Sequence, residues 1–220
     1  MAKLVAPLFS QEARGKAGSI IYNTYRGIAT AKSFAAPVQP NTAAQINARS
    51  RMTDASRAWA ALNNDQRAAW EVYADTHLET DWTGKPKRLT GANWFCRCYT
   101  RSKLVGGSGV TTAPTNDAPT APAITAIAYN SGSGGKIEVT YSTAPASGIV
   151  WVFYGLGPIS DGRVPKIQLA AIQKQVTHSD TSPDDIYTAP SSGRYGVWYQ
   201  AIDAATGLAS GLSYAQVEPW

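Results

Sequence analysis

The fold depends most on residues 40–77, which have the sequence PNTAAQINARSRMTDASRAWAALNNDQRAAWEVYADTH. Thr42 follows a proline and an asparagine, so its hydroxyl is placed to cap a helix that begins there. Apolar side chains then recur at alternating steps of four and three along one helical face, and they are Ala48, Met52, Ala55, Trp59 and Leu62. The pattern predicts an amphipathic helix that ends near Leu62.

A second helix is predicted to begin at Asn63, with almost no loop before it. Asn63 and Gln66 have the spacing of a capping box, in which each side chain bonds the backbone N–H of the other. Trp70, Tyr73 and Ala74 supply the apolar face. Because the connection is so short, we expect the two helices to fold back on each other as an antiparallel hairpin.

A third short helix follows a loop, with Thr90 as its cap and Trp94, Phe95, Cys98 and Tyr99 on it. Residues 40–103 thus form a helical assembly domain that holds four of the seven tryptophans. The domain has few large apolar side chains for its length, so we expect its stability to depend on neighbouring subunits.

Residues 1–39 are predicted to be an N-terminal arm. Two runs rich in β-branched and aromatic residues flank Arg26-Gly27, which is a hairpin signal. A lone two-stranded hairpin is marginal in water, so this one should lean on the helical domain or on another subunit. Residues 11–18 have no periodicity, and we expect them to be flexible until bound.

Beyond the helices, the composition shifts to Gly, Ser, Thr and Pro over residues 104–122, which predicts a linker, flexible first and then stiffer. Residues 123–220 contain about seven short strands separated by turn signals, a number typical of a β-sandwich. The run 149–154 is apolar on both faces, as in a central strand that is covered on both sides. The predicted fold class is α+β with two domains, a helical-hairpin domain with its β-hairpin arm and an all-β sandwich.

The charge is divided unevenly along the chain. Residues 1–110 hold 15 Lys and Arg against 7 Asp and Glu, whereas residues 111–220 hold 5 against 8. The two halves therefore have different partners, or one half has an acidic partner. Nucleic acid is an unlikely partner, because the arginines are not clustered on one helical face, acids lie between them, and no helix-turn-helix or zinc-finger pattern is present.

The sequence offers no catalytic, cofactor or metal site. His77 and His178 lack nucleophile or metal-ligating companions. Cys96 and Cys98 lie two apart on a predicted helix, so they point to different faces, and we expect two reduced thiols. No run is apolar enough to span a membrane, and the N-terminus has no signal-peptide core, so we expect synthesis in a cytosol.

Two groups in the C-terminal half admit a functional and a structural interpretation. The aromatic residues Trp151, Tyr195, Trp198 and Tyr199 would suit a sugar-stacking platform, but at strand spacing they are more typical of core and cross-strand packing. The acids Glu138, Asp180, Asp184 and Asp185 would suit paired carboxylates or a calcium site, yet Asp184-Asp185 after Ser182-Pro183 is more typical of a turn.

Two resemblances extend this interpretation. Residues 15–100 resemble a module found in uncharacterised bacteriophage and prophage structural proteins, and the matching positions are Arg26-Gly27, Pro37, Pro40–Gln45, Arg49, Trp59, Leu62-Asn63, Gln66-Arg67, Trp70, Ala74 and Thr90–Phe95. Residues 190–201 resemble a late strand of fibronectin type III domains, although residues 155–174 are longer than that family expects and an early tryptophan is missing. An immunoglobulin-like sandwich fits equally well.

The first resemblance implies a non-enzymatic virion structural protein, made in the host cytoplasm, without cofactor. We expect the arm and helical domain to dock on a head or tail lattice as a homo-oligomer, with the sandwich displayed outward. Capsid decoration is preferred, ahead of a tail or collar accessory, a host-surface glycan-binding module and, last, a nucleic-acid binder. The residues expected at subunit interfaces are Tyr22, Tyr25, Arg26, Arg49, Arg57, Arg67, Trp82, Lys87 and Arg88.

Overall fold

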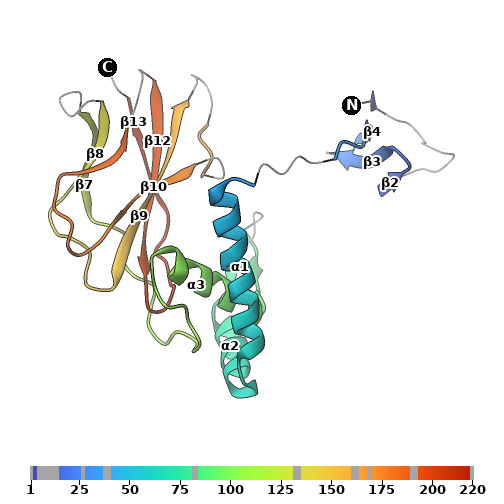
Figure 1. The fold of residues 1–220 in the computed structure, drawn as a ribbon, viewed down its shortest axis with the longest axis horizontal. Coiled ribbons are helices and arrows are strands. Elements are labelled where there is room, and N and C mark those ends of the chain that lie inside the picture. The colour runs from blue at the N-terminus through green and yellow to red at the C-terminus, as the bar shows by residue number, and fades with distance from the viewer. Residues whose placement is uncertain are drawn as a thin grey trace. The chain divides into compact units, whose positions relative to one another are not determined.

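The computed structural model describes residues 2–3, 15–25, 28–36, 41–80, 84–130, 135–159, 164–167, 170–188 and 193–218. The chain divides into two units, Met1–Gln45 and Ile46–Trp220, which are described separately below. Its elements are a small N-terminal antiparallel sheet, three helices, and C-terminal antiparallel sheets consistent with a β-sandwich, which confirms the predicted α+β class (Figure 1).

The first unit is a four-stranded antiparallel sheet in the order β1-β4-β3-β2. The predicted hairpin is present as β3 (Ile20–Tyr25) and β4 (Ile28–Ser33), with Tyr25 opposite Ile28. Two strands were not predicted: β1 (Ala2–Lys3) pairs with β4, and β2 (Gly15–Ala17) pairs with β3. The expectation that residues 11–18 lack structure is thus wrong for residues 15–17, because they extend the ladder of β3.

The second unit begins with the predicted helices, α1 (Ala43–Ala61), α2 (Asn64–Thr76) and α3 (Gly91–Leu104). The capping box at Asn63 is confirmed, since its Oδ1 accepts from Gln66 N at 2.8 Å and Gln66 Oε1 accepts from Asn63 N at 3.0 Å. Thr90 Oγ1 caps α3 by accepting from Asn93 N. In the loop between α2 and α3, β5 (Glu79–Thr80) and β6 (Pro86–Lys87) form a short pair.

The seven C-terminal strands match the predicted number and lie in two sheets. One sheet has the order β11-β8-β7 and the other β10-β9-β12-β13, with bounds β7 (Ile124–Asn130), β8 (Lys136–Tyr141), β9 (Ile149–Ile159), β10 (Ala171–Val176), β11 (Asp184–Thr188), β12 (Arg194–Asp203) and β13 (Ser213–Val217). Side chains from both sheets meet in one core, which includes Ile137 and Val139 of β8 and Phe153 of β9.

The end of α3 packs against the outer face of the four-stranded sheet. Val150 and Val152 of β9 and Ile202 of β12 form a buried cluster on this face, and Leu104 and Val105 at the end of α3 lie against it. The predicted covering of β9 on both sides is therefore confirmed, and the cover on the outer side is α3.

The connection between helices and sandwich is closer than the sequence predicted. Val110 is 4% exposed and joins the core of α2 and α3, as does Leu208 from the loop after β12. The indole N–H of Trp70 donates to Thr111 O at 3.3 Å. Apolar side chains at the start of the Gly-, Ser- and Pro-rich segment thus anchor it, so this part is not the flexible spacer that was expected. The helical domain was expected to depend on neighbouring subunits for its stability. It also packs against apolar side chains of its own chain.

Candidate functional site

The N-terminal sheet has two unlike faces. Strand alternation places Ala17, Ile20, Tyr22, Ala29 and Ala31 on one face, and the register pairs Ile20 with Ala17 and Tyr22 with Ala31. Lys16 and Lys32 lie on the other face, on either side of Ile21 in one cross-strand row. We call the first the apolar face, since none of these side chains is charged, and the second the basic face, although it also carries Ile21.

Neither face is buried by the residues that the structure describes in this unit. Among the side chains described between residues 15 and 36, none is buried, and Ile20 and Phe34 are 41% and 44% exposed. The internal contacts are sparse: Thr30 Oγ1 donates to Asn23 O at 3.0 Å, and the Lys16 ammonium lies 3.8 Å from the centre of the Phe34 ring. A sheet without a buried core is marginal by itself, so its apolar face is available to a partner.

Two of the arginines expected at an interface have contacts inside the chain. Arg67 on α2 donates from Nη2 to Ala60 O at 2.7 Å and so ties α2 to the end of α1. Arg88 pairs with Asp75 and, at 3.0 Å, with Glu71, which fastens the loop before α3 to α2. Both contacts give these arginines a structural role that charge patterning alone did not reveal.

The other expected interface residues are scattered over the described surface. Arg49 and Arg57 are exposed on α1, Lys87 is exposed on β6, and Tyr22 is half-buried on β3. Arg26, Trp82 and the side chain of Tyr25 fall outside the described residues. The role of these residues at subunit interfaces stays a prediction.

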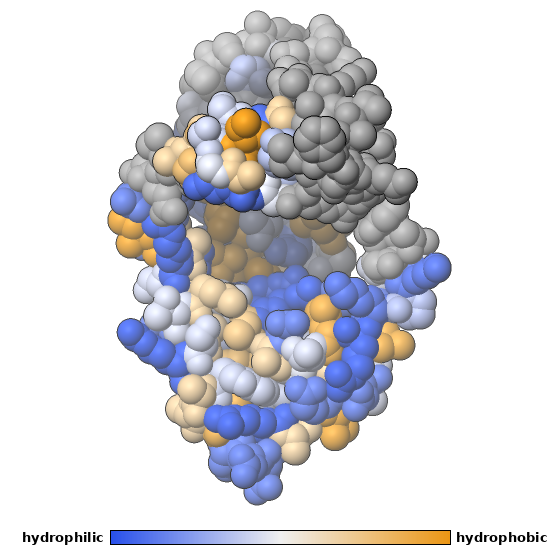
Figure 2. Space-filling view, turned by 90° about the vertical axis from the view of Figure 1, so that its right-hand side faces the viewer, coloured by the Kyte–Doolittle hydropathy of each residue, from blue (hydrophilic) through white to orange (hydrophobic). Residues whose placement is uncertain are grey.

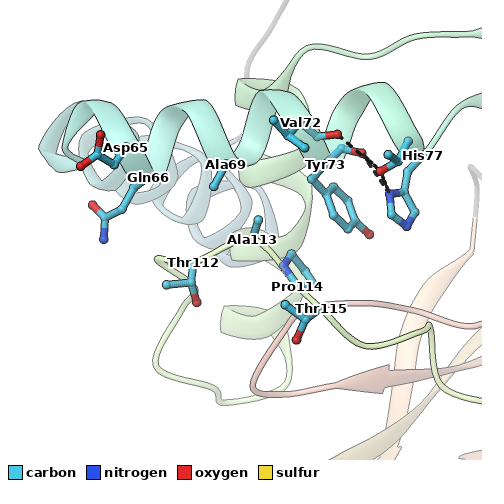
Figure 3. A pocket seen from close by; sticks show the side chains of 11 residues that line it. Asp65, Gln66, Ala69, Val72, Tyr73, His77, Thr112, Ala113, Pro114 and Thr115 are labelled. Carbon is cyan, nitrogen blue, oxygen red and sulfur yellow. Dashed lines mark hydrogen bonds between the residues drawn. The ribbon is translucent and has the colours of Figure 1, made fainter.

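An open groove lies between α2 and the connector, which is the segment of residues 105–123 between α3 and β7. Its volume is about 630 Å³, and Ala69 and Tyr73 of α2 face Ala113 and Pro114 across it (Figure 3). The walls are largely apolar, and Val72 at the rim is 64% exposed. Sequence reasoning missed this groove, because it depends on where the connector runs.

The groove has no arrangement of groups typical of catalysis. His77 stacks on Tyr73 with ring centres 3.9 Å apart, and its Nδ1 lies 2.9 Å from both Tyr73 O and Thr76 Oγ1. These contacts fix the ring at the helix end, and no serine or cysteine lines the groove. Among the residues with described positions, no three or more His, Cys, Asp or Glu side chains group in a way that could hold a metal ion.

Comparison with known proteins gave no match. No protein-family model matches the chain, and neither a curated protein nor a solved structure is significantly similar to it. In the part of the chain that the structure describes, no helix combines the length and hydropathy needed to cross a membrane.

The aromatic residues of the sandwich have the packing role that strand spacing favours. Trp151 and Tyr195 are buried in the core between the sheets, and Tyr199 packs against that core. Trp198 lies on the outer face, is 7% exposed, and contacts Tyr214 with ring centres 5.0 Å apart. The buried tryptophans are not available as a sugar-stacking platform.

The two thiols are free and carried by α3. Cys98 is fully buried, and burial raises the pKa of its thiol to about 11, although Arg101 and Arg97 act in the opposite direction. Burial also raises the pKa of Cys96, which is half-buried. Thiolates are the reactive form, so neither cysteine is an activated nucleophile.

Proposed function

We propose that this chain is a non-enzymatic structural subunit that docks on a larger assembly through its N-terminal sheet. One observation carries the proposal: strands β2, β3 and β4 pair in register, yet none of their described side chains is buried. A sheet of this size needs an apolar surface to pack on. Residues 1–45 contain five Lys and Arg and one Glu, so the complementary surface is apolar and acidic.

The assembly that we propose is a bacteriophage virion. The resemblance over residues 15–100 favours this choice, and the chain would be a homo-oligomeric virion component. Capsid decoration is the preferred placement, with a tail or collar position as the alternative. The major capsid lattice is then the partner that covers the apolar face of the sheet.

For the C-terminal sheets, we propose a fibronectin type III-like sandwich. The fourth strand, β10, pairs with β9 in the four-stranded sheet. In a constant-type immunoglobulin sandwich the fourth strand instead joins the sheet of the first, second and fifth strands. The observed pairing therefore favours the fibronectin-like alternative.

The experiment measures how much of this protein is incorporated into phage particles. Phage particles made with the wild-type chain are purified and tested for the protein, next to particles made with Ile20→Asp or Tyr22→Asp. A carboxylate on the apolar face loses burial and is repelled by an acidic partner, so we expect at least tenfold less protein per particle. Asn23→Asp, on the basic face, is the matched control, because it adds the same charge to the same strand.

Normal incorporation of the Ile20 and Tyr22 variants would show that the apolar face is not the docking surface. Absence of the wild-type protein from mature particles would remove the virion assignment altogether. Loss of the Asn23 variant alone would indicate that the basic face docks instead.

A further inference from the structure

A second surface, separate from the N-terminal sheet, lies between α1 and α3. It is a depression of about 280 Å³, and the residues that line it are Ala48, Arg51, Met52, Thr100, Arg101 and Leu104. α1 belongs to this surface because its first three turns extend beyond the helical core. Ala55 and Leu62 of the predicted apolar stripe are buried, but Met52 is 52% exposed. The predicted apolar stripe is therefore buried at Ala55 and Leu62 but exposed near its N-terminal end, at Met52.

Two arginines, Arg51 of α1 and Arg101 of α3, line the depression, and no carboxylate is among its described lining residues. Among the described residues, Arg51 and Arg101 form no ion pair within the chain, whereas Arg88 and Arg97 both do. Both arginines act on the Tyr154 hydroxyl beside them and partly oppose the rise in its pKa that burial causes. Burial lowers the pKa of Arg101, and its guanidinium still stays charged at neutral pH. Two half-buried arginines that line one depression without a carboxylate are stabilised by an anion.

The walls of the depression limit what that anion can be. Ala48, Met52 and Leu104 make them mainly apolar, and Ile46 nearby on α1 is 52% exposed. On the face shown in Figure 2, pale and orange side chains form a band between hydrophilic ones. A sugar would leave hydroxyl groups unpaired on such walls, and a nucleic-acid backbone would need a longer row of cations. An acidic side chain with apolar neighbours fits both the two arginines and the apolar walls.

Among the described acids of the acidic half, residues 111–220, one has no side-chain partner within the chain. The other described acids of residues 111–220 all have partners within the chain, and the pairs are Glu138–Asn130, Asp180–Thr177, Asp184–Lys174, Asp185–Lys136, Asp203–Thr206 and Glu218–Gln216. Asp117, on the extended connector, is exposed and has no such partner among the described residues. Ala118 and Pro119 follow it and supply an apolar contact surface.

We propose that the depression between α1 and α3 binds the connector of a second copy of this chain, with Asp117 of that copy paired to Arg51 and Arg101. Ala118 and Pro119 then cover the apolar wall at Met52 and Leu104. The contact joins the basic half of one copy to the acidic half of the next. It is a contact between copies, and it involves neither the N-terminal sheet nor the partner that the sheet binds.

The test is self-association of the full chain, measured by sedimentation velocity over a wide range of protein concentration. We expect wild-type association that weakens with salt, and at least tenfold weaker association for the Arg51→Gln/Arg101→Gln double variant and for Asp117→Asn. Arg57→Gln is the matched control, because it removes the same charge from an exposed position of α1. Equal unfolding midpoints show that the variants remain folded.

A second test exchanges the charges between Asp117 and the two arginines. Asp117→Arg alone and Arg51→Asp/Arg101→Asp alone should each fail to self-associate, whereas a mixture of the two should associate again. A wild-type chain that stays monomeric at every concentration would overturn the proposal, as would equal weakening by Arg57→Gln or no recovery in the mixture. Particle incorporation through the N-terminal sheet is measured separately, so either proposal can fail without the other.

Discussion

At the scale of single residues, Gly207 allows the sandwich and α3 to approach each other. Its backbone has a φ of +69°, and an added Cβ would lie 1.9 Å from the carbonyl oxygen of Cys98 on α3. Only glycine avoids both the strained φ and this collision with backbone. The loop that carries Leu208 into the helical core thus depends on this residue.

We expect Gly207→Ala to lower the free energy of unfolding by roughly 2–4 kcal/mol, because backbone must move to make room. Urea denaturation followed by tryptophan fluorescence measures the loss. Gly211→Ala is the control, since an added Cβ there meets nothing within 4 Å and the φ is not in the left-handed region. Equal midpoints for the two variants would contradict the proposed close approach.

The buried thiol of Cys98 makes the stability of the chain sensitive to alkaline pH. Its pKa of about 11 exceeds the ordinary value of 9.0, so the folded state holds the proton more strongly than the unfolded state does. This contribution is fully present below pH 9.0 and is lost as the pH rises towards 11. We expect wild type to lose on the order of 2 kcal/mol more than Cys98→Ala over that range. If the free energy of unfolding falls with pH in parallel for wild type and Cys98→Ala, the loss does not come from the Cys98 thiol.

At the scale of secondary-structure elements, local chemistry defines where helices begin. The capping box at Asn63 satisfies two backbone N–H groups at the start of α2 and permits the abrupt turn after α1. Such contacts involve residues three apart in the chain, so sequence spacing was sufficient to predict them. The apolar period on α1 did not show that Met52 remains 52% exposed, because burial depends on distant neighbours.

Removing the cap should destabilise α2. We expect Asn63→Ala to reduce the free energy of unfolding by about 1 kcal/mol, because the N–H of Gln66 loses its acceptor. Asn64→Ala, at the adjacent exposed helical position, controls for the change in side chain and should be near neutral. Circular dichroism during urea denaturation distinguishes the two, and an equal loss would mean that the cap is not the cause.

At the scale of the whole molecule, helices and sandwich share buried surface. Ser102 on α3 is fully buried, and its hydroxyl donates to Ala204 O at 2.6 Å and accepts from Gly109 N at 3.3 Å. Leu208, from the same loop as Ala204, enters the core of α2 and α3. The helical block and the sandwich are therefore expected to unfold together as one unit.

Leu208→Ala tests this coupling. We expect a loss of roughly 2–4 kcal/mol, because a buried side chain is replaced by a cavity. The midpoints reported by helical circular dichroism and by near-ultraviolet signals from the sandwich should shift equally. Two separate transitions, of which only one shifts, would mean that helices and sandwich unfold independently.

The sequence by itself determined the features that arise from neighbours along the chain. Helix caps at Asn63 and Thr90, the hairpin around residues 26–27 and the alternation in β8 depend on spacings of a few residues, and all are present in the structure. The sequence also indicated that β9 is covered on both faces. It did not indicate which element covers the outer face of β9.

Only the tertiary structure decided that α3 and the start of the connector lie on that sheet, and that Arg51 and Arg101 meet in one depression. It likewise revealed that Arg67 and Arg88 serve contacts within the fold. The physical reason is that burial and charge pairing depend on distance in space. Residues on different elements meet only after the elements pack, and no local period records which of them will.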